Sequence, residues 1–98
     1  MIRADEDQLA QFCRKNHIRR LSVFGSAMTD RFTNKSDIDL LVEFEPSHRV
    51  GFLGMTAIER ELSAFFGGRR IDLRTPAELS PLFRDEVLKT ASLQYISQ

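Results

Sequence analysis

Two aspartates separated by one residue, Asp37 and Asp39, open an apolar run that reads as a β-strand. Successive residues of a strand point to opposite faces, so the two carboxylates share one face. Their Cβ atoms are then roughly 7 Å apart, and two such acids cannot both stay buried and ionised without a compensating charge. Mg²⁺ compensates well, because it takes oxygen ligands and usually combines one or two carboxylates with substrate phosphates. The pair therefore indicates a site for a hard cation.

A phosphate-binding element is expected shortly before this pair. Gly25 and Ser26 follow another apolar run, and ten residues separate Ser26 from Asp37. A glycine after a strand lets the backbone approach a ligand closely. If a short helix begins at Ser26 and runs to about Arg31, its free N–H groups and its dipole form an anion site. The stretch from Leu21 to Phe44 thus pairs an anion site with a cation site.

The elements that must position these residues follow from the apolar periodicity. Alternation of apolar and polar residues predicts strands, and apolar residues at spacings of three and four predict helices. Asp5 with Gln8 resembles a capping box, and Gly67-Gly68 is typical of a left-handed helix end. Strands are expected over residues 18–24, 37–45 and 69–74, and helices from Asp5, from about residue 52 to Phe66, and from Thr75 onward.

The long helix expected up to Phe66 has an apolar stripe that we assign to the core rather than to a cofactor site. Its polar residues, Glu59, Arg60 and Glu61, lie mostly on the other side. The stripe consists of Met55, Ile58, Leu62, Phe65 and Phe66.

The C-terminal part begins with two helix-start patterns. Thr75-Pro76-Ala77-Glu78 combines a threonine cap, a first-position proline and a third-position glutamate, and Ser80-Pro81 repeats the start. Residues 93–96 are either a frayed tail or a short extended piece. The apolar face of the last helix is expected to contain Phe83, Val87, Leu88 and Ala91.

Composition describes an ordinary globular chain. Its 98 residues are 42% hydrophobic and 29% charged with no net charge, which fits one domain over residues 1–98. The charge balance gives no basic footprint, so a nucleic-acid acceptor is not indicated. No apolar run approaches the roughly 20 residues of a membrane span, and no secretory signal is seen. The single cysteine, Cys13, excludes an internal disulfide, indicates a reducing cytoplasm, and is read as a small buried hydrophobe.

The combined pattern resembles the signature of the DNA polymerase beta-like nucleotidyltransferase superfamily, which is Gly-Ser, ten residues and Asp-x-Asp. With its short length, the whole chain resembles a minimal nucleotidyltransferase (MNT) domain, the antitoxin half of HEPN/MNT toxin–antitoxin pairs. The resemblance implies an α/β (α+β) nucleotidyltransferase fold, a small mixed β-sheet with helices packed on it. It also implies a third carboxylate on a later strand, and Asp72 in Arg70-Ile71-Asp72-Leu73 fits that position.

The activity that the resemblance implies is Mg²⁺-dependent transfer of AMP from ATP to a hydroxyl group, with pyrophosphate leaving. Two metal ions in such sites clamp the attacking and leaving oxygens. Asp37 and Asp39 would bind both ions. Asp72 would complete the site of the ion that activates the acceptor and is a candidate for taking its proton. Gly25 and Ser26 would hold the β and γ phosphates.

One stretch departs from the superfamily pattern. Many members carry Arg-Gly after the small residue pair that follows Gly-Ser, whereas this chain has Thr29-Asp30 there. The basic contact to the triphosphate would then come from Arg31, from Lys35, or from neither, in which case both are solvated loop charges.

Several charged or aromatic residues near this stretch have less specific roles. Glu43 shares the face of Asp37 and Asp39 and is expected to be solvated or at the pocket edge. His48 and Arg49 either reach a bound nucleotide or belong to a solvated loop. His17 has no Cys or His neighbour at ligand spacing, so we interpret it as a helix-end or loop residue.

The expected acceptor is a separate macromolecule, because 98 residues hold the catalytic sheet, its helices and little else. In the resembled family it is a tyrosine of a HEPN ribonuclease toxin, so a hetero-oligomer is expected. Two alternatives stay open, an antitoxin that acts by binding alone and an enzyme with a small-molecule acceptor. The three aspartates favour the enzyme over the pure binder, and the small size disfavours a small acceptor.

Overall fold

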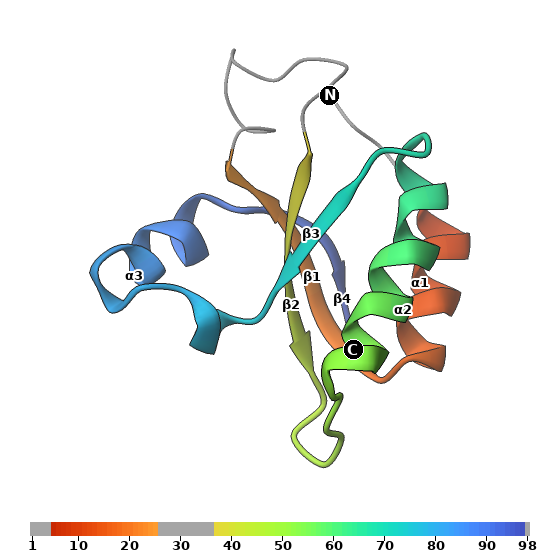
Figure 1. The fold of residues 1–98 in the computed structure, drawn as a ribbon, viewed down its shortest axis with the longest axis horizontal. Helices are drawn as coiled ribbons and strands as arrows, with labels where there is room; N and C mark the ends of the chain where they lie inside the picture. Colours follow the sequence, from red (N-terminus) through yellow and green to blue (C-terminus); the bar gives the residue numbers. More distant parts are fainter. Residues whose placement is uncertain (1–4, 26–36, 98) are drawn as a thin grey trace.

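A four-stranded mixed β-sheet forms the centre of the computed structural model, which describes residues 5–25 and 37–97 (Figure 1). The strands are β1 (Ile18–Phe24), β2 (Ile38–Phe44), β3 (Ile71–Arg74) and β4 (Ser92–Ile96), in the spatial order β3-β2-β1-β4. β1 pairs antiparallel with β2 and with β4, whereas β2 and β3 are parallel. The expected mixed sheet is confirmed.

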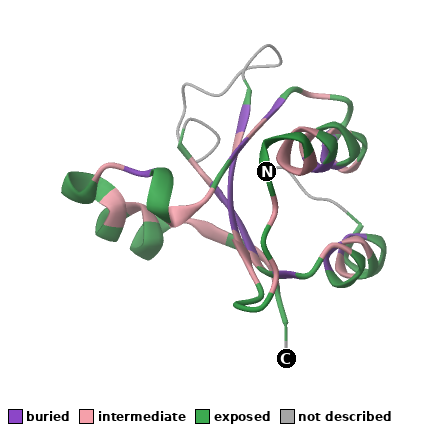
Figure 2. Cartoon of the chain, turned by 60° about the horizontal axis from the view of Figure 1, so that its bottom comes forward, coloured by how far each residue is buried: buried purple, intermediate pink, exposed green. Residues whose placement is uncertain are grey.

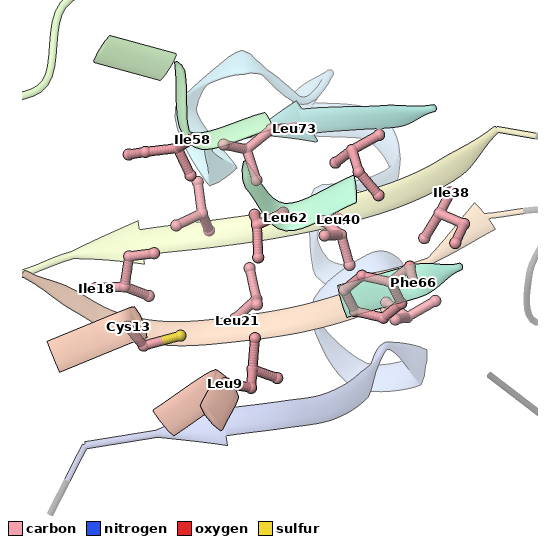
Figure 3. Packing of buried hydrophobic residues seen from close by; sticks show 13 residues of the cluster. Leu9, Cys13, Ile18, Leu21, Ile38, Leu40, Ile58, Leu62, Phe66 and Leu73 are labelled. Atoms are coloured by element: carbon pink, nitrogen blue, oxygen red, sulfur yellow. The ribbon is translucent and has the colours of Figure 1, made fainter. Parts of the chain in front are cut away.

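Two helices cover one face of this sheet. They are α1 (Glu6–Lys15) and α2 (Phe52–Ser63), which continues into the 3₁₀ turn η2 (Ala64–Phe66) and lies beside α1 in Figure 1. Side chains from both helices and from the first three strands meet in one apolar core (Figure 3). The core contains Leu9, Cys13, Ile18, Leu21, Val23, Ile38, Leu40, Val42, Ile58, Leu62, Phe66, Ile71 and Leu73.

The ends of these helices follow from local chemistry. The Asp5 carboxylate accepts a hydrogen bond of 2.9 Å from the Gln8 backbone N–H, which satisfies one of the free donors of the first turn. η2 ends at Gly67, whose φ of 72° is left-handed. Both predicted helix ends are confirmed, and so is the apolar stripe, since Ile58, Leu62 and Phe66 are buried.

The segment after β3 contains both predicted helix starts, at Thr75 and at Ser80, although the first begins only a short turn. The capping box of Thr75 and Glu78 forms, yet it starts a single 3₁₀ turn, η3 (Pro76–Glu78). Pro81 disfavours a helical conformation at the residue before it. Ser80 is accordingly extended, with ψ 135°, and caps a separate helix, α3 (Pro81–Thr90).

The apolar face predicted for the last helix is not buried within this chain. None of the ten residues of α3, all of them described, is buried, and the helix lies across the sheet from α1 and α2 (Figures 1 and 2). Leu82 is 96% exposed, and Phe83 and Leu88 are also exposed. Residues 93–96 take the extended alternative, because they belong to β4.

None of the helices in the described part of the chain has the length and apolar character that a membrane crossing needs.

Candidate active site

Strand register brings two of the three predicted aspartates side by side. Asp39 of β2 is the register partner of Asp72 of β3, and their neighbours Leu40 and Leu73 are partners as well. Adjacent strands lie about 4.8 Å apart, and the two aspartates alternate with core residues, so both carboxylates emerge on the face away from α1 and α2. The predicted meeting of a later-strand acid with the Asp-x-Asp strand is thus present in the fold.

Gly25 lies directly against Asp39. Phe24, the last residue of β1, is the register partner of Asp39, and Gly25 follows it with a φ of +73°. A Cβ atom built on Gly25 would collide with the Asp39 carboxylate and would lie 3.1 Å from its Cγ atom. Only glycine combines this left-handed conformation with so close an approach, which joins the Gly-Ser and Asp-x-Asp parts of the motif in space.

Asp37 lies at the entrance to β2. It precedes the first strand residue, Ile38, and its side chain is exposed. The backbone N–H of Ile38 donates to the Arg70 carbonyl at 2.9 Å, which ties this entrance to β3. Within residues 5–25 and 37–97, no three His, Cys, Asp or Glu side chains are grouped closely enough to hold one metal ion. Asp37 therefore flanks the Asp39–Asp72 pair rather than completing a closed cluster with it.

The donor set still suits Mg²⁺. Mg²⁺ usually binds through one or two carboxylates together with substrate phosphates, rather than in an all-protein cage. Asp39 and Asp72 supply hard oxygen donors from neighbouring strands, and the Asp39 carboxylate occupies the place that a side chain at Gly25 would fill. These residues fit the cation, with Asp37 as a further oxygen donor at the rim.

Arg74 is a site residue that the sequence reasoning did not single out. Its Nη2 atom donates to Asp72 Oδ2 at 3.4 Å, and both side chains are partly exposed. The signal was available, because residues i and i+2 of a strand share a face. Arg74 places one positive charge beside the acid pair.

Ser26, Arg31 and Lys35, the other predicted nucleotide contacts, lie outside the described residues, as does the helix expected to begin at Ser26.

The loop with His48 lies at the opposite end of the sheet. His48 stacks on His17, which precedes β1, with ring centroids 4.1 Å apart, and His17 Nδ1 is 3.4 Å from Glu45 Oε2. Asp39 is at the other end of β2, roughly 16 Å away for five residues at 3.3 Å each. His48 therefore belongs to a loop away from the acid pair, and the alternative in which His48 and Arg49 reach a bound nucleotide stays a prediction.

Glu43 is half-buried, and its Oε2 atom lies 3.7 Å from Arg20 Nε.

Cys13 is fully buried in the core, as predicted. Burial raises the pKa of its thiol from 9.0 to about 12, and neighbouring Arg14 opposes this only in part. A nucleophile must be a thiolate near neutral pH, so this residue has no catalytic role. The two cavities described, about 850 and 410 Å³, are likewise lined by residues other than the three aspartates.

The comparisons with known proteins agree with this geometry. Residues 7–97 match the polymerase beta nucleotidyltransferase family. A protein of Methanocaldococcus jannaschii that is named as a protein adenylyltransferase is 32% identical over 77 residues, which cover 79% of this chain and 80% of that protein.

Solved structures share the fold. One described as a minimal nucleotidyltransferase has a TM-score of 0.69 at 29% identity, covering 88% of this chain and 85% of its own. A toxin–antitoxin structure with AMP-PNP has a TM-score of 0.71 at 18% identity, and the match covers 96% of this chain and 75% of the other. A tri-AMPylated Shewanella oneidensis HEPN toxin in complex with an MNT antitoxin gives 0.63 at 17%, with 95% and 71% covered. Since the family match spans nearly the whole sequence, the chain belongs to the polymerase beta nucleotidyltransferase family and is a nucleotidyltransferase.

Proposed function

We propose that this nucleotidyltransferase moves AMP from ATP to a tyrosine hydroxyl of a partner HEPN ribonuclease toxin and thereby neutralises it. The observation that carries the proposal is the register pair Asp39–Asp72 beside the left-handed Gly25. Two adjacent carboxylates next to a glycine backbone suit a reaction in which a phosphate chain and its cation are held together.

The reaction forms one bond and breaks one. The acceptor oxygen attacks the α-phosphorus of ATP, the bond from that phosphorus to the bridging oxygen breaks, and pyrophosphate leaves. Asp72 takes the hydroxyl proton, because its side chain is partly exposed and a general base must be within hydrogen-bond reach of the proton. Gly25, with Ser26 after it, would bind the β and γ phosphates, and Arg31 or Lys35 are candidates for a basic contact to them.

Two Mg²⁺ ions, held by Asp37, Asp39 and Asp72, would neutralise charge on the attacking and leaving oxygens. The chain's own part is then to hold its carboxylates in register. Asp39 is fixed between β1 and β3, so it is the residue on which the geometry of the site depends most.

The names of the similar proteins support the nucleotide and the partner in this proposal. The Methanocaldococcus relative is named for protein adenylylation, and two structures of the same fold contain AMP-PNP or an AMPylated HEPN toxin. A cytoplasmic setting belongs to the proposal as well, since a buried free thiol such as Cys13 suits a reducing compartment.

The intact mass of the neighbouring-gene product, coexpressed with this protein, tests the proposal. We expect mass increments of whole AMP units with the natural chain and none with Asp37→Ala/Asp39→Ala. Asp7→Asn is the matched control, because Asp7 is an exposed acid of α1, on the far side of the sheet, and should leave the increments unchanged.

An unmodified partner that forms a stable complex with both forms would overturn the transfer reaction and would favour an antitoxin that acts by binding. Increments of a different nucleotide would keep the enzyme and replace ATP as the substrate.

A further inference from the structure

β3, the strand that carries Asp72, is held in the sheet by few backbone hydrogen bonds. β3 has four residues and is an edge of the sheet, so among the described strands only β2 pairs with it. Short edge strands have one row of backbone donors and acceptors without a neighbouring strand. An acid whose direction matters is thus placed on the strand with the least backbone support.

The outward row of β3 can be identified from the ladder. The Ile38 N–H donates to the Arg70 carbonyl at 2.9 Å, so Arg70 faces β2. In a parallel ladder the residues that face the neighbour alternate, so Asp72 faces β2 as well. The backbone N–H of Leu73 then points away from the sheet.

A side chain of α2 accepts the hydrogen bond that a neighbouring strand would otherwise accept from β3. Glu59 Oε2 accepts the outward N–H of Leu73 at 2.8 Å. One turn further along α2, the Ser63 hydroxyl donates to the Arg69 carbonyl at 2.6 Å. Residues four apart share one face of a helix, so one face of α2 binds β3 at Leu73 and the segment that leads into β3 at Arg69, one on each side of Asp72.

The burial pattern of α2 agrees with a role for Glu59. Its neighbours Arg60 and Glu61 are exposed, whereas Glu59 is partly buried beside the core strand. A carboxylate in such a position loses solvation and needs a hydrogen bond in return. The bond to Leu73 supplies it, and a hydrogen bond to an ionised acceptor is about twice as strong as a neutral one.

We infer that Glu59 is a positioning residue for Asp72, which deepens the proposed function and rests on it for its catalytic consequence. The N–H that Glu59 binds belongs to the peptide bond between Asp72 and Leu73. Fixing that peptide plane, together with the preceding one, whose N–H faces β2, fixes the direction of the Cα–Cβ bond of Asp72. Glu59 itself lies on the α2 side of the strand and acts on the site through the backbone alone.

Glu59→Leu tests this inference, with Glu59→Gln as the conservative variant and Glu61→Leu as the matched control on the exposed face of α2. We expect Glu59→Leu to lower kcat roughly 10²-fold, since a misplacement of about 1 Å can cost that much, with the KM for ATP within about twofold. Glu59→Gln keeps an acceptor oxygen and should recover most of the rate. Glu61→Leu should leave it unchanged.

Non-additivity separates positioning from a general structural role. In an Asp72→Asn background, Glu59→Leu should lower the rate no further, because residues that act through one group are coupled. A full additional loss in that background, or an equal loss in Glu61→Leu, would overturn the inference.

Nuclear magnetic resonance decides the inference independently of activity. In the natural chain and in Glu59→Gln, Asp72 should hold one χ1 rotamer and the Leu73 amide should exchange slowly. In Glu59→Leu, the rotamer should average and the amide should exchange at least tenfold faster. If the natural chain transfers no nucleotide, the proposed function fails, while an unchanged Asp72 rotamer in Glu59→Leu is what would overturn the role of Glu59.

Discussion

Asp39 and Leu40 are neighbours on β2 and meet opposite surroundings. Leu40 is completely buried under α1 and α2, within a core of thirteen residues. Asp39 points to the other face, where its register neighbours are Phe24 and Asp72. In Figure 2 the buried positions lie mainly along the sheet, with a few on the two covering helices, whereas α3 has none.

The two faces of the sheet therefore have different roles. The helix-covered face supplies the free energy of folding, because burial of apolar area is the dominant favourable contribution. The opposite face, which we call the acid face, carries Asp39 and Asp72, and the strand register fixes the distance between their two charges. A change on one face should therefore alter stability, and a change on the other should alter chemistry.

The largest expected effect is on the acid face. Asp39→Asn removes one charge from the Asp39–Asp72 pair with almost no change in shape, so we expect nucleotide transfer to fall roughly 10³-fold, as for other groups that stabilise reacting charge. The free energy of unfolding should stay within about 0.5 kcal/mol, as for substitutions outside the core. Transfer rates and urea unfolding measure the two quantities. A variant that unfolds, or that keeps full activity, would contradict the division between the faces.

The next effect belongs to the buried neighbour. Leu40→Ala leaves a cavity in the core, and such changes cost 2–5 kcal/mol, so about 3 kcal/mol is expected here. Thermal unfolding should then begin at least 10 °C lower, given roughly 4–8 °C per kcal/mol for a domain of this size. Below the unfolding transition, the transfer rate per folded molecule should be unchanged. A rate that falls more than the folded fraction would mean that the two faces are not separable.

Local patterns were sufficient to predict much of this arrangement. β1 begins and ends at the expected residues, Ile18 and Phe24, because Leu21 and Val23 alternate with Ser22 and a glycine follows Phe24. The cap at Asp5 and the glycine end after Phe66 depend on a few adjacent residues, so sequence alone identifies them.

The mistaken or missing predictions depend on contacts between distant segments. The contact of η3 with β2, and the burial of the Leu79 that follows it, are not revealed by any local pattern. Glu59 reads as part of a polar helix face, and its bond to Leu73 becomes visible only when α2 lies beside the edge strand. Residues 93–96 became a strand because β1 offers an unpaired edge.

The third prediction concerns how far the core under α1 and α2 excludes solvent, measured by the reactivity of the Cys13 thiol. Cys13 has a pKa of about 12 in the folded chain, so its thiolate fraction at pH 8 is small. We expect a disulfide reagent such as DTNB to react about 100-fold more slowly with the native protein than with the urea-unfolded chain. As the pH rises, the Cys13 thiol ionises in the unfolded chain before it ionises in the folded protein. The contribution of Cys13 to the free energy of unfolding is therefore constant below pH 9 and falls between pH 9 and 12. Rapid reaction of Cys13 with DTNB in the native protein would show that solvent reaches the core under α1 and α2.

The last comparison uses two glycines, Gly25, which adjoins Asp39, and Gly67, which ends η2. Gly25 and Gly67 have nearly the same left-handed φ, +73° and +72°, so alanine at either position should cost about 1 kcal/mol. They differ in surroundings, because a Cβ at Gly67 meets nothing within 4 Å, whereas one at Gly25 meets Asp39.

Gly67→Ala should therefore lower stability and leave the transfer rate per folded molecule unchanged, while Gly25→Ala should lower the rate about tenfold as well. Parallel unfolding curves and transfer assays on the two variants measure this difference. If both variants lose the same activity, backbone strain alone explains the effect. If neither does, the close approach of Gly25 to Asp39 has no part in the chemistry, and the glycine of the motif serves only to end β1.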